Sequence, residues 1–130
     1  MNFSIKRTLA FASASAMIAV ILGALAAHAL PPHLSETQMH SFETAVRFQM
    51  YHSLALLALP LLNLTGISVS KWVIGLMMAG ILLFSGSIYL LATRPITGLP
   101  IGFLGPVTPL GGVCLIASWG LLFWNILKKK

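Results

Sequence analysis

The chain alternates between long apolar runs and short polar breaks, and this pattern predicts four helices. The apolar runs cover approximately residues 8–30, 41–62, 71–92 and 110–127. Each run approaches or exceeds the about 20 residues with which an α-helix crosses the hydrocarbon core of a bilayer. We therefore expect an all-α membrane protein, built as a four-transmembrane-helix bundle in a single integral membrane domain, residues 1–130.

The first break contains residues that typically end one helix and begin another. Pro31 and Pro32 end the first helix because proline cannot continue the backbone hydrogen bonds. In the loop 31–40, Ser35 and Gln38 have the spacing of a helix-capping box. This spacing predicts a short helical turn ahead of the second helix.

The other two breaks, residues 63–70 and 93–109, differ in character. The former is a brief polar turn. The latter contains four prolines and three glycines, too many for a regular helix, yet it is too apolar for a loop surrounded by water. We expect the loop 93–109 on the membrane surface or dipping against the bundle.

The first apolar run has a second interpretation as a secretion signal. Lys6 and Arg7 precede the run, and residues 27–29 read Ala-His-Ala, which resembles a cleavage site. The run is longer than the about 7–15 apolar residues of such signals. We therefore favour an uncleaved first helix, with a removed leader as the alternative.

Composition and charge support the membrane interpretation. Hydrophobic residues make up 58% of the chain and charged residues only 8%, whereas soluble domains carry about 25% charged residues. The net charge of +6 comes from bases that stand singly or at the ends of the runs, so we expect no nucleic-acid partner. The single Cys114 excludes an internal disulfide, and its apolar surroundings predict an inert buried thiol.

The distribution of the bases predicts the orientation. With four spans, one side of the membrane carries Lys6, Arg7, Lys71 and the lysines 128–130, and the other carries Arg47 and Arg94. Cytoplasmic loops are enriched in such bases, so we expect both termini in the cytoplasm. Trp72 and Trp124 stand beside the bases, as an aromatic belt at the inner interface would require.

Most polar side chains within the apolar runs fall on the outer side in this topology. We expect them to form an outer-leaflet cluster, a candidate binding site. Its members are His28, Glu43, Arg47, Gln49, Tyr51, His52, Tyr89 and Arg94. Ionisable residues inside a membrane are costly and normally face protein or a water-filled cavity.

The second helix presents two polar faces. Glu43, Arg47 and Tyr51 recur every four residues and share one face, while Gln49 and His52 lie on roughly the opposite face with Ala45 and Leu56. The simpler interpretation of Glu43 and Arg47 is a structural ion pair. The functional interpretation is an outward-facing pocket for a small anion, a lipid headgroup or a proton.

Small residues predict the faces at which helices approach closely. Gly23 and Ala27 have this spacing in the first helix, and Gly75, Ala79 and residues 85–87 have it in the third.

The sequence provides no catalytic, metal-binding or cofactor-binding pattern. His28 and His52 could in principle clamp a haem iron, but they differ in depth and no further ligand has a recognised spacing. Ser53 beside His52 is not a catalytic pair, because adjacent helix residues point in different directions. We therefore expect no metal, no cofactor and no enzymatic activity.

Four stretches together resemble the signatures of a known family. They are residues 23–30 (Gly-Ala-Leu-Ala-Ala-His-Ala-Leu), 42–55, 84–89 and 104–112. Over essentially its whole length the chain is similar to the domain-of-unknown-function 423 family of small bacterial inner-membrane proteins, of which the animal transmembrane protein 256 looks like a relative. Phe48 stands where the family more often has tyrosine, so a hydroxyl there is not essential to a shared role. The resemblance implies a multi-pass protein of the bacterial inner (plasma) membrane without an established activity.

These observations lead to three hypotheses about function. The first is a non-enzymatic membrane accessory or assembly factor, whose partners are the lipid bilayer and either another membrane protein or further copies of this chain. The alternative is an oligomeric channel or a transporter of ions or small solutes, with the outer polar cluster as its vestibule. The third is an enzyme that acts on lipid headgroups at the outer interface.

Overall fold

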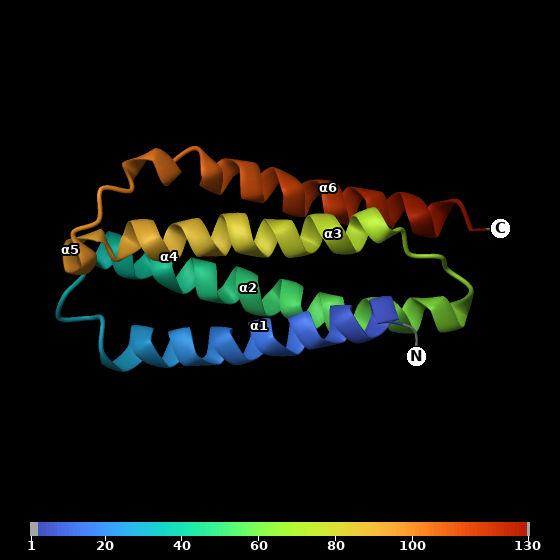
Figure 1. Cartoon of the computed structure of the whole chain (residues 1–130), viewed down its shortest axis with the longest axis horizontal. Coiled ribbons are helices and arrows are strands. Elements are labelled where there is room, and N and C mark those ends of the chain that lie inside the picture. The colour runs from blue at the N-terminus through green and yellow to red at the C-terminus, as the bar shows by residue number, and fades with distance from the viewer. Residues whose placement is uncertain (1–2, 130) are drawn as a thin grey trace.

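The structure, a computed structural model, describes residues 3–129 and consists of helices and short connections (Figure 1). Four of its segments are long and apolar enough to cross a membrane, as the hydrophobic pattern predicts. The elements are α1 (Phe3–His28), α2 (Glu36–Leu62), η1 (Asn63–Thr65), α3 (Lys71–Gly80), η2 (Ile81–Ser85), α4 (Gly86–Ala92), α5 (Arg94–Thr97), η3 (Gly102–Leu104) and α6 (Val107–Leu127).

The long helices run antiparallel to their chain neighbours, so the bundle has two distinct ends (Figure 1). The terminal end contains both ends of the chain and the connection 63–70. The loop end contains the connections 29–35 and 93–106. Helix α1 packs mainly on α2, the segment α3–η2–α4 lies between α2 and α6, and α6 closes the far side.

The observed helix boundaries differ from the predicted ones at the starts of three spans. Helix α1 begins at Phe3 rather than near residue 8, so Lys6 and Arg7 lie in its first turns. Helix α2 begins at Glu36 rather than near residue 41, because the Ser35–Gln38 capping box starts the helix itself and not a separate turn. Helix α6 begins at Val107 rather than near residue 110, since Pro109 occupies the first turn, where proline is tolerated. The predicted loop 93–109 accordingly contains α5, η3 and the start of α6.

Helix α1 meets α2 through a face of small side chains. The buried positions of α1 recur at helical spacing and carry short side chains: Thr8, Ala12, Ser15, Ala19 and Ala26. Small residues allow two membrane helices to approach closely. The predicted pair is not the packing face, because Ala27 is exposed and only Gly23 faces α2, where a Cβ would lie 3.5 Å from Val46.

Two glycines set the distance between α6 and the middle of the third span. A Cβ on Gly111 would lie 2.3 Å from the backbone nitrogen of Phe84, and one on Gly80 would lie 2.4 Å from the side chain of Leu115. Real Cβ atoms essentially never lie this close to other heavy atoms, so neither position has room for a side chain without movement of its neighbours. The contact falls at η2, a π-helical turn within the span. Gly75, one of the glycines expected to pack, has open space around it instead.

The interior has apolar clusters towards both ends of the bundle. Towards the terminal end, Leu56, Val73, Met77 and Leu122 belong to a core cluster to which all four spans contribute. Towards the loop end, Phe42 packs with Ala26 and Ala92. Between these clusters most of the buried side chains with polar groups are found, among them Ser15, Gln49 and His52. This polar layer contains the candidate site.

Candidate functional site

Gln49 is the central residue of α2 and connects three helices. Its Nε2 donates to the backbone carbonyl of Ser15 on α1 at 2.8 Å and lies 3.3 Å from the Ser15 hydroxyl. Its Oε1 accepts from the hydroxyl of Tyr89 on α4 at 2.5 Å. Ser53, one turn further along α2, lies 2.7 Å from the Ser15 hydroxyl. The carboxamide is thus bonded at both ends inside the bundle.

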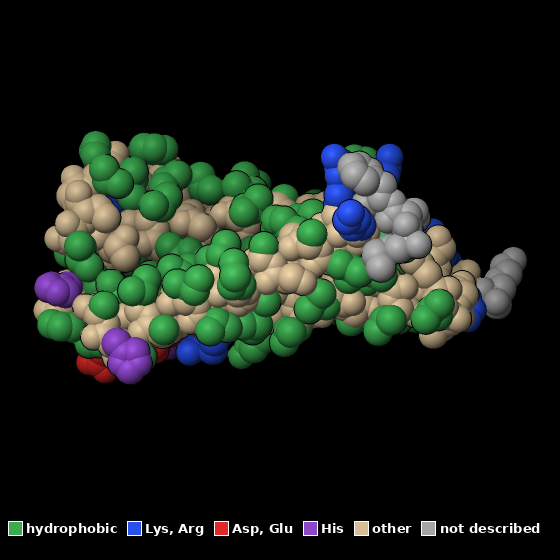
Figure 2. All heavy atoms as spheres, turned by 60° about the horizontal axis from the view of Figure 1, so that its bottom comes forward, with side chains coloured by type: hydrophobic (Ala, Val, Ile, Leu, Met, Phe, Trp, Pro, Cys, Tyr) green, Lys and Arg blue, Asp and Glu red, His purple; other side chains and the backbone are tan. Residues whose placement is uncertain are grey.

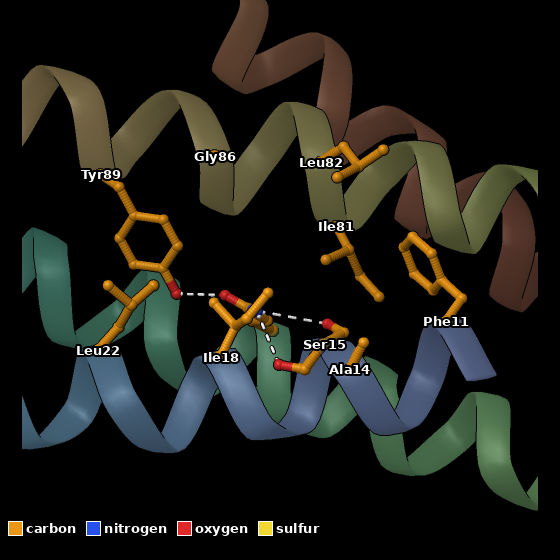
Figure 3. Close-up of a pocket in the computed structure, with 10 residues that line it drawn as sticks. Phe11, Ala14, Ser15, Ile18, Leu22, Ile81, Leu82, Gly86 and Tyr89 are labelled. Atoms are coloured by element: carbon orange, nitrogen blue, oxygen red, sulfur yellow. Dashed lines mark hydrogen bonds between the residues drawn. The ribbon is translucent and has the colours of Figure 1, made fainter. Parts of the chain in front are cut away.

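This network forms the polar part of an otherwise apolar groove between α1 and α4 (Figure 3). The groove has a volume of about 410 Å³, within the usual range of ligand sites. It exists because α1 packs on α2 and makes little contact with α4. Its lining is Phe11, Ala14, Ser15, Ile18, Leu22, Gln49, Ile81, Leu82, Gly86 and Tyr89.

His52 lies in a second polar contact, with α6. Its Nε2 is 3.0 Å from the indole nitrogen of Trp119, and its Nδ1 is 2.6 Å from the carbonyl oxygen of Phe48. An indole N–H can only donate, so Nε2 is the acceptor and Nδ1 carries the hydrogen that the carbonyl accepts. Both ring nitrogens of His52 are therefore used within the chain, in a neutral ring.

The predicted outer-leaflet cluster divides into buried and exposed residues. Gln49 and His52 are buried and Tyr89 is half-buried, and of the eight predicted residues only Gln49 and Tyr89 are joined by a hydrogen bond. The other members lie on the surface of the bundle: His28, Glu43, Arg47, Tyr51 and Arg94. Figure 2 shows the histidine and carboxylate side chains gathered towards one end of the molecule.

The depth of Gln49 and His52 also differs from the prediction. Because α2 begins at Glu36, both residues lie near the middle of the helix and not at its outer end. The two faces of α2 are as predicted, with Ala45, Gln49, His52 and Leu56 buried together. His28 is exposed at the loop end of α1, so it does not share a site with His52.

The predicted ion pair between Glu43 and Arg47 does not form, so this prediction is wrong. In the described part of the chain no salt bridge joins the two side chains. Arg47 Nη2 instead donates to the hydroxyl of Thr44 at 3.1 Å. Thr44 in turn donates to the carbonyl of His40. Both charged side chains are exposed, so each can also reach headgroups or water.

Ser15, Ser53 and Trp119 also belong to the polar layer, although they were not predicted as site residues. The signal for Ser15 was its place on the small-residue face with Ala12 and Ala19. Nothing in the sequence places Trp119 beside His52, because that contact depends on how α6 rotates around Gly111.

The fold and site define a class of protein: a small multi-spanning membrane protein whose polar side chains bond to one another between helices. Comparison with known families identifies it further. The family model described as "Protein of unknown function (DUF423)" matches residues 22–112, and the chain belongs to this family. No solved structure matches it at a significant level.

Bacterial relatives resemble it over most of their length. A UPF0382 membrane protein of Staphylococcus saprophyticus is 40% identical, over 88% of this chain and 91% of the relative. The UPF0382 membrane protein YwdK of Bacillus subtilis is 39% identical, over 88% and 90% respectively. The UPF0382 inner membrane protein YgdD of Escherichia coli is 34% identical, over 94% and 90%. The chain is therefore a member of an uncharacterised membrane protein family.

Proposed function

We propose that this protein is a non-enzymatic accessory or assembly factor of the bacterial inner membrane, which binds a transmembrane helix of another membrane protein. Both termini would lie in the cytoplasm, since the terminal end carries most of the bases. The inner membrane location is supported by the name of the Escherichia coli relative.

The observation that carries this proposal is the use of the buried polar groups. Gln49, Tyr89 and His52 bond to neighbouring helices, and so do the hydroxyls of Ser85 and Ser118, which donate to the carbonyls of Ala45 and Val73. Interhelical hydrogen bonds of this kind hold membrane helices together. Side chains used in this way favour a structural role over a catalytic one.

The surface available for a partner is therefore the lipid-facing one, and the groove beside α1 is its main concavity. A helix about 10 Å across fills about 400 Å³ in one 5.4 Å turn. The groove, at about 410 Å³, thus holds side chains from a helix that lies along it and not the helix itself. The exposed Ala10 and Ala14 on α1 would allow such a helix to approach closely.

Site-specific photo-crosslinking in native membranes tests this proposal. A photoreactive residue replaces Leu82, which lines the groove and is 62% exposed, or Ile116, which is 73% exposed on α6 and does not line it. We expect a discrete protein adduct from position 82 and only lipid adducts from position 116. Lipid adducts alone at both positions, or an adduct only with a second copy of this chain, would contradict the proposal.

The alternative, a channel or transporter, requires more than one copy. Within one chain the bundle towards the terminal end is filled by apolar side chains, including Leu56, Met77 and Leu122, whereas a conduction path needs polar lining across the membrane. A path would therefore have to run between copies. Ion or proton flux into proteoliposomes above that of empty vesicles would favour this alternative.

A further inference from the structure

A separate cavity lies at the terminal end of the bundle, between the connection 66–70 and the end of α6. Its volume is about 350 Å³. The lining residues are Gly66, Ser68, Asn125, Lys128 and Lys129. It shares no residue with the groove beside α1, so a ligand in this cavity is independent of the partner proposed for the groove.

The wall of this cavity contains a buried donor without an acceptor. Asn125 is 2% exposed, and its Oδ1 accepts from the backbone N–H of Ser70 at 2.8 Å. That bond fixes the orientation of the carboxamide, because only oxygen can accept there. Among the described residues, its Nδ2 meets no acceptor. Buried unpaired donors are rare in native proteins, so an acceptor supplied from outside the chain would complete this site.

Two lysines supply positive charge to the same cavity. Lys128 and Lys129 are exposed, and the ammonium of Lys129 donates to the carbonyl of Thr65. That side chain crosses Gly66, where a Cβ would lie 3.3 Å from Nζ. Lysine side chains are long and flexible, so both ammonium groups can turn towards a ligand without movement of the backbone.

The charge of this end of the bundle favours an anion. The only acids of the chain, Glu36 and Glu43, lie on α2 towards the opposite end. Lys6 and Lys71 add exposed positive charge at the terminal end, and Figure 2 shows most of the basic side chains there. Phosphate oxygens accept hydrogen bonds from ammonium groups and from amide N–H groups, and this cavity offers both.

The depth of the cavity indicates where such a phosphate comes from. Trp72 and Trp124 are exposed at this end, and the Lys71 ammonium lies 5.7 Å from the centre of the Trp72 ring. Exposed tryptophans of membrane proteins gather at the level of the lipid headgroups. The cavity at the same end of the bundle therefore lies at the depth of headgroup phosphates.

We infer that this cavity binds a phosphate group and that an anionic phospholipid supplies it. Asn125 Nδ2 donates to a phosphate oxygen, while Lys128 and Lys129 neutralise its charge. Lys129 thereby contributes to the site as well as to the contact with Thr65.

Native mass spectrometry of the full chain in detergent, titrated with phosphatidylglycerol, tests this site. Replacing both lysines (Lys128→Gln with Lys129→Gln) is expected to weaken binding about 30-fold, since each lysine near an anionic lipid contributes about fivefold. The matched control is Lys6→Gln with Lys71→Gln, which removes the same charge from the same end without touching the cavity. It is expected to lose less than about fivefold.

A second variant and a second probe complete the test. Asn125→Asp keeps the acceptor for Ser70 but replaces the free donor with a negative oxygen, and it is expected to weaken phosphatidylglycerol binding while leaving phosphatidylcholine binding unchanged. Inorganic phosphate at constant ionic strength is expected to compete only at far higher concentration, and equal potency would identify soluble phosphate as the ligand. Equal losses in the two double variants, or no preference for phosphatidylglycerol over phosphatidylcholine, would overturn the inference.

Discussion

Tyr89 and Gln49 are joined by a hydrogen bond of 2.5 Å that connects α4 to the centre of α2. The bond forms the polar part of an otherwise apolar groove, so breaking it would leave the Tyr89 hydroxyl and Gln49 Oε1 without a partner in apolar surroundings. It therefore stabilises the association of the helices. Interhelical hydrogen bonds in membrane proteins contribute about 0.6 kcal/mol on average and at most about 1.7 kcal/mol.

Removing either partner of this bond is expected to destabilise the bundle. Tyr89→Phe should lower the free energy of unfolding by about 0.5–1 kcal/mol, and Gln49→Leu by more, about 1–2 kcal/mol, because it also removes the bonds to Ser15. Reversible unfolding in bicelles measures both. Tyr51→Phe is the matched control, since Tyr51 is exposed and its hydroxyl makes no hydrogen bond within residues 3–129. An equal effect of the two tyrosine variants would exclude a contribution from the Tyr89–Gln49 bond.

The glycine contact between α6 and η2 leads to a second prediction. Gly111→Ala should destabilise the protein by about 1–3 kcal/mol or more, because the atoms it would meet belong to the backbone of Leu83 and Phe84 and cannot turn away. Gly80→Ala should cost less, since it meets the side chain of Leu115. Gly75→Ala, with nothing within 4 Å, should be neutral or slightly stabilising. Thermal unfolding in nanodiscs ranks the three, and a tolerated Gly111→Ala would show that α6 does not pack this closely.

The contact between Trp119 and His52 can be tested by two substitutions that both lie on α6. Trp119→Phe leaves His52 Nε2 without a donor in a buried position, and the expected cost is about 1 kcal/mol. Trp124→Phe is the control on the same helix. Trp124 is exposed and its indole nitrogen makes no hydrogen bond to the described part of the chain, so this substitution should lower the free energy of unfolding by less. If the two variants have equal free energies of unfolding, the hydrogen bond between Trp119 and His52 does not stabilise the protein.

Glu43 and Arg47 should behave as independent surface residues. We expect Glu43→Leu and Arg47→Leu to have additive effects, with a coupling energy below about 0.5 kcal/mol, because Arg47 bonds to Thr44 and not to Glu43. A double-mutant cycle measures this coupling. A coupling above about 1 kcal/mol would restore the ion pair that the sequence suggests.

The fold follows from the sequence because the membrane imposes strong and local constraints. The length of the apolar runs predicts the spans. The Ser35–Gln38 capping box marks the start of α2, although it was predicted to begin only a short turn ahead of that helix. Helical spacing also predicts that Gln49 and His52 share a face with Ala45 and Leu56.

The site could be predicted only in part, because it depends on how helices rotate against one another. The exposure of Glu43 and Arg47 and the pairing of Gln49 with Ser15 are set by the contact between α1 and α2. Polar character and the expected topology grouped the charged surface residues with the buried Gln49 and His52. Gln49 and His52 lie nearer the middle of α2 than predicted, because the prediction counted from a helix start that lay too late in the chain.

Filling the groove tests most directly whether it holds side chains of a partner's transmembrane helix. Gly86 lines the groove and a Cβ there meets nothing within 4 Å, so Gly86→Leu fills the space without disturbing the packing. Gly75→Leu adds the same side chain at another open glycine that does not line the groove. With photoreactive position 82 in both backgrounds, we expect the protein adduct to be lost in Gly86→Leu and retained in Gly75→Leu. An adduct that survives in Gly86→Leu, with both variants folded, would contradict the groove as the binding site.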